Sequence, residues 1–410
     1  MLLVRLLLAV LPGAAASGLS FDPMFLNGAV LLQDAKVSVW GRSGAHGGTV
    51  ELSLDGEVMA HATVDDTGRW EAMLPPQPTS WARTLAVADK KAPVLGATVA
   101  VKFGAVVLCS GQSNMGMPVR HWDPCCDQPP AARDPEHRCS CFGADNGTAE
   151  IAAAGRYTGK ISLASMQTPF PKPAAWRGDD CKYPWTNASC ISHPTWNDAL
   201  PGVYGTVHGF SAVCWYTGKS LYEQLGGRVP VGLLVGAVGG SPIEFWLPAG
   251  HVNNSVCGLD EPPCDPGGKN NYTDSEFFGR LISFFQPYTL GAVVWDQAER
   301  DVHCLPSAFP NAPENETARY SCMEKQLVDS WRAGFKSQFA FTAIQLPGYL
   351  GDCGTFDECM ANLLPMRLAQ EAPLLDDPLA SVTASYDQGC PFGVKTAVCP
   401  FGSVHNVNSE

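Results

Sequence analysis

Apolar and polar residues alternate in short runs along the first part of the chain. Residues 36–40 (KVSVW) and 49–54 (TVELSL) repeat with a period of two, which is typical of strands that bury one face. Asp55-Gly56 favours a tight hairpin turn, and Thr67-Gly68 marks another turn. The pattern predicts a small antiparallel β domain, of the sandwich type, over residues 18–103, without a catalytic constellation.

A different pattern begins at residue 104, where apolar runs alternate with amphipathic segments. Helical periodicity marks residues 211–225, which end at two glycines, and residues 277–285. Four apolar runs predict buried strands, at residues 106–108, 231–238, 291–295 and 339–346. Strands that alternate with helices indicate a parallel sheet, so we expect an α/β domain with flanking helices over residues 104–410.

Three small polar clusters follow the first three of these strands. They lie at residues 111–114 (GQSN), 239–244 (GGSPIE) and 297–299 (QAE). The C-terminal ends of parallel strands meet at one edge of the sheet, where ligands bind in such folds, so we expect the clusters to converge. Ser113 in the first cluster is a candidate nucleophile, because it follows a buried strand directly.

The other two clusters hold groups that such a serine needs. Glycines in the second cluster let backbone N–H groups approach a ligand closely. The neutral amide of Gln297 is able to donate a hydrogen bond to a developing oxyanion. An ionised Glu299 only accepts hydrogen bonds, so we expect it to orient its neighbours. Glu244 suits a charge at a helix N-terminus equally well.

The first 17 residues have the features of a secretory signal peptide. Arg5 precedes a short apolar run at residues 6–11, and alanines at positions 14–16 fit a cleavage site before Ser17. No later apolar run is long enough to span a membrane, so we expect no stable membrane anchor. The expected location is the extracellular space or an endomembrane lumen, lysosomal or vacuolar.

Cysteine content and sequons agree with that location. The chain holds 16 cysteines, an even number, and disulfide bonds are expected in an oxidising compartment. Pairs close in sequence are candidates: Cys257–Cys264, Cys353–Cys359 and Cys390–Cys399. Another group also suits a metal, but its Pro- and Asp-rich loop favours disulfides: Cys125, Cys126, Cys139 and Cys141. Five N-x-S/T sequons predict glycosylated surface loops: Asn146, Asn187, Asn253, Asn271 and Asn315.

Charge narrows the range of partners. Charged residues make up 16% of the chain, the net charge is −13, and the sequence has no basic patch, which argues against nucleic acid as a partner. An acidic surface suits a secreted protein and says little about the substrate. We expect neither a metal nor another cofactor, and nothing in the sequence indicates the oligomeric state. Three tryptophans suit either a sugar site or core packing: Trp185, Trp196 and Trp246.

Six stretches of the chain share a pattern with a known family. In chain order they are AVLLQDAKVSVWG, CSGQSNMGMPV, HGFSAVCWYTGKSLYEQLG, VPVGLLVGAVGGSPIEFW, GAVVWDQAERD and CPFGSVH. A lone G-x-S-N is weak, whereas GQSNM, GGSPIE-x-W, W-x-Q-x-E and PFGS-x-H form a specific combination. In content and order they resemble the sialate O-acetylesterase family of the SGNH-hydrolase superfamily. The resemblance covers most of the chain and implies an SGNH-hydrolase-like parallel sheet.

The resemblance also implies a role for each matching residue. Ser113 in GQSNM would be the nucleophile and His405 in PFGSVH its general base. The N–H groups of Ser113 and Gly240 would form the oxyanion hole, with the Gln297 amide as a third donor. Other polar residues of the motifs would bind substrate or support the site: Gln112, Asn114, Glu244 and Glu299. The pattern alone does not select this histidine among nine, since two others also lie near element ends: His208 and His303.

The chain departs from the family at three places. Ala298 stands where the third motif usually has glycine, so its methyl group would crowd the oxyanion site or need another backbone angle. Gly402 stands where many SGNH hydrolases have an aspartate three residues before the histidine; Asp387, Glu299 or a backbone carbonyl would then orient His405. Family members continue well beyond the histidine motif, which here lies five residues from the last one, so we expect a truncated C-terminus.

These features predict a serine carboxylic-ester hydrolase that removes O-acetyl groups through an acetyl-enzyme. The resemblance implies O-acetylated sialic acid as the substrate, while the residues themselves support only an acetyl ester of a polar alcohol. Two alternatives stay open here: a deacetylase of acetylxylan-type polysaccharide, and a secreted glycan-binding protein with impaired catalysis. A purely structural extracellular module would leave the three polar clusters unexplained.

Overall fold

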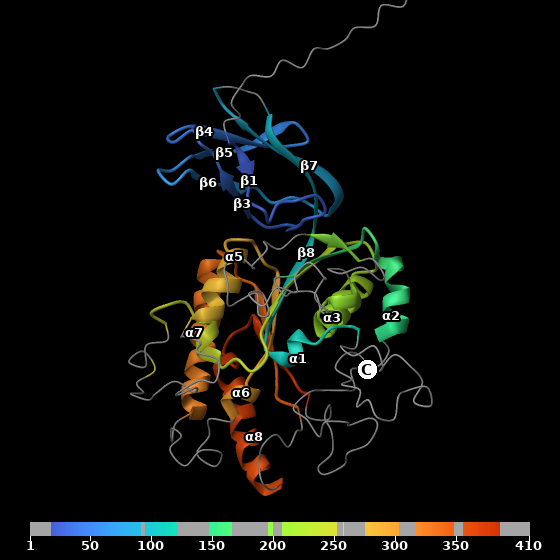
Figure 1. Ribbon diagram of the computed structural model, residues 1–410, viewed down its shortest axis with the longest axis vertical. Helices are drawn as coiled ribbons and strands as arrows, with labels where there is room; N and C mark the ends of the chain where they lie inside the picture. Colours follow the sequence, from blue (N-terminus) through green and yellow to red (C-terminus); the bar gives the residue numbers. More distant parts are fainter. Residues whose placement is uncertain are drawn as a thin grey trace, which may run out of the picture.

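The computed structural model describes residues 18–91, 95–120, 147–165, 196–199, 207–251, 257, 275–302, 316–347 and 356–385. A small β part lies at one end of a larger part, in which helices stand on both sides of a central sheet (Figure 1). Several predictions concern residues outside this set: the signal peptide, the five sequons, the group Cys125 to Cys141, Cys353, Cys390, Cys399, Trp185, His303, Asp387, Gly402 and His405.

The small part is mostly antiparallel, as its period-two pattern predicts, although its short strand β2 pairs in parallel with β8. One three-stranded sheet has the order β1-β3-β6. The other strands pair in the order β5-β4-β7-β8, with β4 and β5 joined by the predicted hairpin turn. Asp55 and Gly56 in this turn both have positive φ, at 51° and 87°, which is what the favoured two-residue hairpins require. The strands are β1 (Ser20–Phe21), β2 (Val30–Leu32), β3 (Val37–Arg42), β4 (Thr49–Leu54), β5 (Glu57–Thr63), β6 (Arg69–Leu74), β7 (Ser80–Asp89) and β8 (Leu95–Gly111).

Strand β8 belongs to both parts of the molecule. Its first half pairs with β7 in the small part, and its second half pairs in parallel with β11 (Val231–Ala237) and β12 (Ala292–Asp296). Figure 1 shows it descending from the small part into the centre of the large one, with α1 at its end. One continuous strand therefore crosses residue 103 and carries the chain to the first polar cluster.

The large sheet is mostly parallel. Its strand order is β10-β9-β11-β8-β12-β13-β14, and within this order only β10 runs antiparallel to its neighbour. All four strands predicted from apolar runs are confirmed. Three short strands were not predicted, because they lack a long apolar run: β9 (Ile161–Ser165), β10 (Asn197–Asp198) and β14 (Ala380–Thr383). The fourth predicted run is β13 (Ala340–Ile344).

Alternate side chains of β8 pack on opposite layers, as expected for a strand buried on both faces. Val107 and Cys109 join the core cluster on the side of α3, while Val106 and Leu108 join the larger cluster that holds Trp331 of α7. The predicted helices at 211–225 and 277–285 are confirmed, the second beginning as a π-helical turn, Phe278–Ile282. The helices are α1 (Ser113–Gly116), α2 (Gly147–Ala153), α3 (Ala212–Gln224), α5 (Ser283–Phe285), α6 (Glu299–Val302), α7 (Glu316–Gly334) and α8 (Phe356–Glu371).

Aromatic residues attach the small part to the large one. The Tyr288 hydroxyl donates to the Val30 carbonyl at 2.7 Å, and its ring contacts that of Phe25 at 5.6 Å. Trp196 is buried at the same junction and donates from Nε1 to the Met24 carbonyl at 3.0 Å. Trp196 is therefore a packing residue and not part of a sugar site, the two roles that its sequence left open.

Two disulfide bonds join described residues. Cys109 of β8 pairs with Cys214 of α3, with Cα atoms 5.8 Å apart. Cys257 pairs with Cys322 of α7, so the predicted pair Cys257–Cys264 is wrong. Proximity in sequence is a poor guide to pairing, because a disulfide needs Cα atoms within about 7 Å in the folded chain. Among the described residues, no helix has both the length and the apolar character that a membrane span requires.

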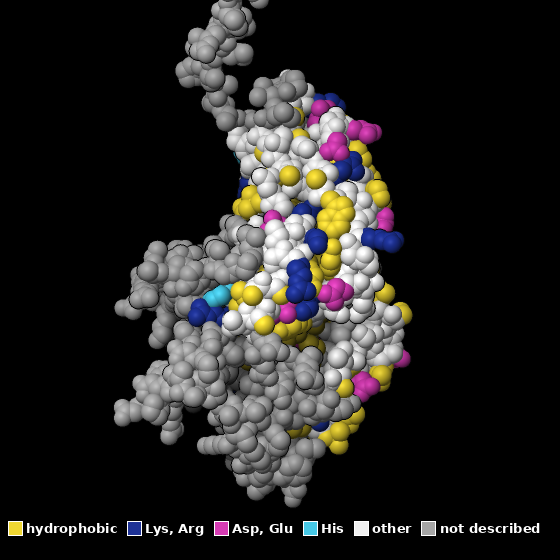
Figure 2. Space-filling model, turned by 90° about the vertical axis from the view of Figure 1, so that its right-hand side faces the viewer, with side chains coloured by type: hydrophobic (Ala, Val, Ile, Leu, Met, Phe, Trp, Pro, Cys, Tyr) yellow, Lys and Arg dark blue, Asp and Glu magenta, His cyan; other side chains and the backbone are white. Residues whose placement is uncertain are grey.

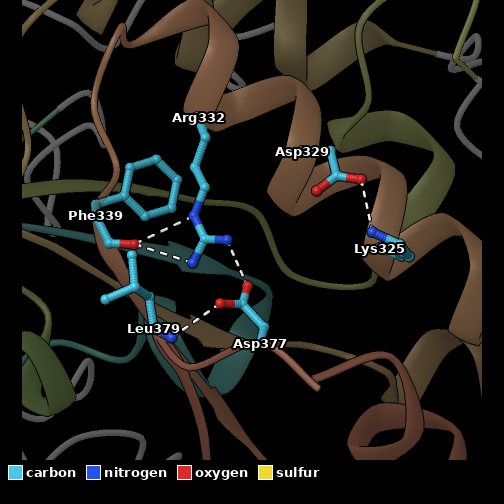
Figure 3. Close-up of polar contacts among 6 residues, drawn as sticks. All are labelled: Lys325, Asp329, Arg332, Phe339, Asp377 and Leu379. Carbon is cyan, nitrogen blue, oxygen red and sulfur yellow. Dashed lines mark hydrogen bonds and ion pairs between the residues drawn. The ribbon is translucent and has the colours of Figure 1, made fainter. Parts of the chain in front are cut away.

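A side-chain clasp ties α7 to the far strands of the sheet (Figure 3). Arg332 donates from Nε and Nη2 to the Phe339 carbonyl at 3.3 and 3.1 Å, and its Nη1 is ion-paired with Asp377. Asp377 in turn accepts the Leu379 N–H at 2.9 Å, just before β14. Burial works to raise the pKa of Asp377, but the hydrogen bonds from Arg332 and Leu379 outweigh it, so the net shift is downward.

The clasp predicts a stability difference between two acidic residues that pair with side chains of helix α7. Asp377→Asn removes the charge opposite Arg332 and should lower the free energy of unfolding at pH 7 by about 1.5–3 kcal/mol. Because the pKa of Asp377 is lowered on folding, this contribution is present above its unfolded pKa and is lost as the pH falls below it. Asp329→Asn breaks an exposed pair with Lys325 and should cost less than about 1 kcal/mol. Urea denaturation checks both; equal effects would contradict the clasp.

Candidate active site

The first polar cluster lies at the C-terminal end of the central strand. β8 ends at Gly111, and the Gln112 N–H donates to the Asp296 carbonyl of β12 at 2.9 Å. Gly111 has φ +135°, and a Cβ built there would lie 2.0 Å from that carbonyl oxygen, so only glycine allows this approach. Ser113 then begins the one-turn helix α1 and is partly exposed. The strand thus presents the predicted serine at the edge of the sheet.

The glycine loop of the second cluster lies directly against this serine. Val238 donates its N–H to the Gly111 carbonyl at 3.0 Å, which aligns the end of β11 with that of β8. A Cβ built on Gly239 would lie 3.3 Å from the Cβ of Ser113. Gly240 has φ +72°, is exposed, and has open space where a Cβ would stand. The loop therefore lies against Ser113 at Gly239 and leaves open space at Gly240.

The third cluster holds both neighbours of the serine. Arg300 of α6 donates its N–H to Gln112 Oε1 at 3.4 Å, and Asn114 donates from Nδ2 to Glu299 Oε1. Gln112, Asn114 and Glu299 are all buried. Helix α6 therefore braces the turn on both sides of Ser113. The three clusters lie together, as their places after parallel strands predict.

Gln297 is fully buried and joins the second cluster to the third. Its Nε2 donates to the Ser241 carbonyl at 2.8 Å and to Asp301 Oδ2 at 2.5 Å. From the sequence we expect this amide to face an oxyanion. In the structure both amide hydrogens are directed to protein acceptors.

Glu244 is likewise buried, in the 3₁₀ turn Ile243–Trp246. One of its carboxylate oxygens lies 3.6 Å from Arg319 Nη2 of α7, and the same guanidinium pairs with Glu316 at 3.3 Å. Arg319 is 1% exposed, so this ion-pair group lies beneath the edge of the sheet. Trp246 is also fully buried and donates to Ser241 Oγ at 2.9 Å, so it packs below the site.

Burial opposes the ionisation of several carboxyl groups near the site. It raises the pKa of Asp296 to about 7 and, with a further contribution from the charge of Asp296, the pKa of Glu299 to about 8. The hydrogen bond from Asn114 works in the opposite direction on Glu299. Burial, and then the charges of Glu244 and Glu316, raise the pKa of Asp301 well above its usual range. Asp296 and Glu299 are therefore not both ionised near pH 7.

Three residues of the buried polar network around the site were not predicted from the sequence. Asp301 follows Gln297 by four positions, a spacing that places both on one side of a helical turn, so a signal was present. Arg319 and Gln370 gave none, because they come from helices far along the chain. Gln370 of α8 donates from Nε2 to the carbonyls of Gln297 and Ile344, at 2.9 and 3.1 Å. It thereby holds the backbone at the end of β12.

The remaining candidates from the sequence concern another histidine, a metal site and charged surface residues. His208 Nε2 contacts Arg120 Nη1 at 2.9 Å, in the 3₁₀ turn before α3. Within the described ranges, no group of histidine, cysteine and carboxylate side chains is arranged to hold a metal ion. On the face of the molecule drawn in Figure 2, the described Lys and Arg side chains are interspersed with Asp and Glu.

Ala298 keeps a backbone angle that suits glycine. It has φ 129°, is fully buried, and its carbonyl accepts the Val302 N–H at 2.9 Å, which starts helix α6. A side chain in this region costs on the order of 1–3 kcal/mol. The alanine of the third motif therefore lies in a backbone region that favours glycine, which places strain at this position.

Ala298→Gly should therefore stabilise the protein. We expect the free energy of unfolding to rise by about 1 kcal/mol, after subtracting the entropy that glycine loses on folding. The same substitution at Ala333, an exposed position in α7, should lower it by about 0.5–1 kcal/mol. Chemical denaturation of both variants gives the comparison, and a loss of stability at position 298 would show that the angle carries no strain.

Comparison with known proteins gives a consistent set of relatives, although no family model matches the chain. Sialate O-acetylesterase from Rattus norvegicus is 29% identical over 286 residues, which cover 61% of this chain and 44% of the relative. The protein of the same name from Mus musculus is 26% identical over 391 residues, covering 85% of this chain and 64% of the relative. The chain thus spans less than two thirds of the length of these curated relatives.

A solved structure has the same architecture. The carbohydrate acetylesterase from Xanthomonas citri superposes with a TM-score of 0.65 at 21% identity, covering 95% of this chain and 71% of that one. At this identity the likeness concerns the fold. The names of the curated relatives agree with the family that the motifs resemble.

Proposed function

This chain is related to the sialate O-acetylesterases, and on that premise we propose that it is an SGNH-type serine carboxylic-ester hydrolase that removes O-acetyl groups from sugars. The observation that carries the proposal is the position of Ser113. It stands at the end of the central strand, between a glycine loop and a helix that is hydrogen-bonded to both of its neighbours. A turn serine without a catalytic role would need neither brace.

The geometry supports attack by Ser113 on an ester carbonyl. Its Oγ adds to the acetyl carbon, and the carbonyl oxygen becomes negative. The N–H groups of Ser113, at the start of α1, and of Gly240, in the exposed glycine loop, are the donors for that oxygen. The open space above Gly240 accommodates a substrate group. Both donors belong to backbone, so they are already oriented before substrate arrives.

A histidine completes the chemistry. We assign His405 of the PFGSVH motif as the general base, because a serine hydroxyl needs a neutral imidazole to take its proton. The imidazolium then gives this proton to the sugar oxygen as the bond between that oxygen and the acetyl carbon breaks, which releases the sugar hydroxyl and leaves an acetyl-enzyme. A water molecule deprotonated by the same histidine attacks this ester, the bond to Ser113 Oγ breaks, and the imidazolium returns the proton to Oγ as acetate leaves. The acetyl group thus passes from sugar to serine to water.

The substrate class follows from the relatives. Their names refer to acetyl esters of sialic acid, so O-acetylated sialic acid is our first choice and acetylxylan-type polysaccharide the second. The disulfide bonds Cys109–Cys214 and Cys257–Cys322 support a secreted or lumenal location, because such bonds persist in oxidising compartments.

Release of acetate by the purified protein is the test. We expect hydrolysis of 9-O-acetyl sialic acid that exceeds hydrolysis of acetylated xylan. Ser113→Ala and His405→Ala should each lower kcat by about 10⁴-fold or more, as removal of either member does in other serine hydrolases. Ser220→Ala, an exposed serine on α3, is the matched control and should leave kcat unchanged.

Three results separate the candidates. A preference for xylan would identify the polysaccharide deacetylase. Activity that survives Ser113→Ala would rule out the serine mechanism. A folded wild-type protein that releases no acetate but retains affinity for glycans would identify the binding protein.

A further inference from the structure

Asp301 connects two segments that are far apart in sequence. Its Oδ1 accepts the Ile243 N–H at 3.3 Å, and its Oδ2 accepts Gln297 Nε2 at 2.5 Å. Gln297 Nε2 also donates to the Ser241 carbonyl at 2.8 Å. Asp301 and Gln297 therefore hold residues 241–243 at both ends, on the two sides of Pro242.

The segment that they hold continues directly from the proposed oxyanion loop. Ser241 is fixed further by its own hydroxyl, which donates to the Val238 carbonyl at 2.7 Å and accepts Trp246 Nε1 at 2.9 Å. In contrast, Gly240 is exposed and would have no neighbour within 4 Å of a Cβ. The backbone of Gly240 is thus held from both sides, because Val238 donates its N–H to the Gly111 carbonyl and Ser241 is fixed by its own hydrogen bonds.

The surroundings of Asp301 keep it in place. It is fully buried, as are Glu244 and Glu316, whose charges oppose its ionisation. Arg319 of α7 pairs with both glutamates and supplies positive charge to this group. Glu324, also on α7 and fully buried, is a further acidic neighbour. A carboxyl so enclosed has little freedom to rotate, which suits a fixed support for a loop.

We propose that Asp301 is a positioning residue for the esterase reaction. It orients the Gly240 N–H through Ile243 and through Gln297, and the Gln297 amide acts in the same support instead of touching the substrate. The inference rests on the proposed function, since it concerns the oxyanion donors of that reaction. It assigns a role to Asp301, the last residue of the stretch GAVVWDQAERD, to which the sequence analysis gave none.

A double-mutant cycle separates support from direct contact. Asp301→Asn offers one acceptor oxygen where the carboxylate offers two, so at least one of its two hydrogen bonds is lost. We expect Asp301→Asn and Gln297→Ala each to lower kcat by about 10- to 100-fold with little change in KM. The double variant should lose scarcely more than the worse single variant, because both act on one loop. Multiplied losses would show that Gln297 contacts the reacting centre independently and would overturn the proposal.

Hydrogen–deuterium exchange gives a readout that does not depend on activity. The peptide that spans residues 238–246 should exchange faster in Asp301→Asn and in Gln297→Ala than in the wild type, because the Ile243 N–H or the Ser241 carbonyl loses its partner. Asp329→Asn, at an exposed carboxylate on α7, is the control and should exchange like the wild type. Unchanged exchange in both variants overturns the proposal, whether or not the wild type releases acetate. Failure of the wild type to release acetate would instead sink the proposed function.

Discussion

The approach of β8 to β12 at Gly111 is the constraint on which the site depends. The Gln112 N–H donates to Asp296, and the Val238 N–H donates to Gly111, so the ends of three parallel strands are aligned within one layer of backbone hydrogen bonds. A side chain at Gly111 would collide with the Asp296 carbonyl and separate them. Because β8 also continues from the small β part, the turn that holds Ser113 is attached to a strand that pairs in both parts of the molecule.

A layer of buried polar side chains beneath this edge holds the three polar clusters in fixed positions relative to one another. Asn114, Gln297 and Asp301 each donate or accept across two segments of chain, so none of the three polar clusters is held by its own strand alone. Such a layer is costly to desolvate, and the raised pKa values of Asp296, Glu299 and Asp301 record that cost. In the proposed reaction, this layer would hold the backbone donors in place, so that they need no rearrangement when negative charge develops.

The sequence predicts the strands, the hairpin and the meeting of the polar clusters, because each depends on local periodicity or on the polarity of parallel strands. It does not predict the partners of buried polar groups. The sequence of helix α7 gives no sign that Arg319 has a buried partner, and only the folded chain brings this residue to Glu244. Cys257 pairs with Cys322 and not with its close neighbour in sequence for the same reason. Long-range pairing is a property of the packed chain, which one sequence does not reveal.

The central claim is that Ser113 is an activated nucleophile, and covalent labelling tests it most directly. The oxygen of an activated serine displaces fluoride from a fluorophosphonate probe and forms a stable phosphonyl ester. Mass spectrometry then locates this ester on a single peptide. We predict modification of the folded protein at Ser113 and none after Ser113→Ala or after unfolding. A folded protein that stays unlabelled at Ser113 under conditions that label other serine esterases would contradict the account.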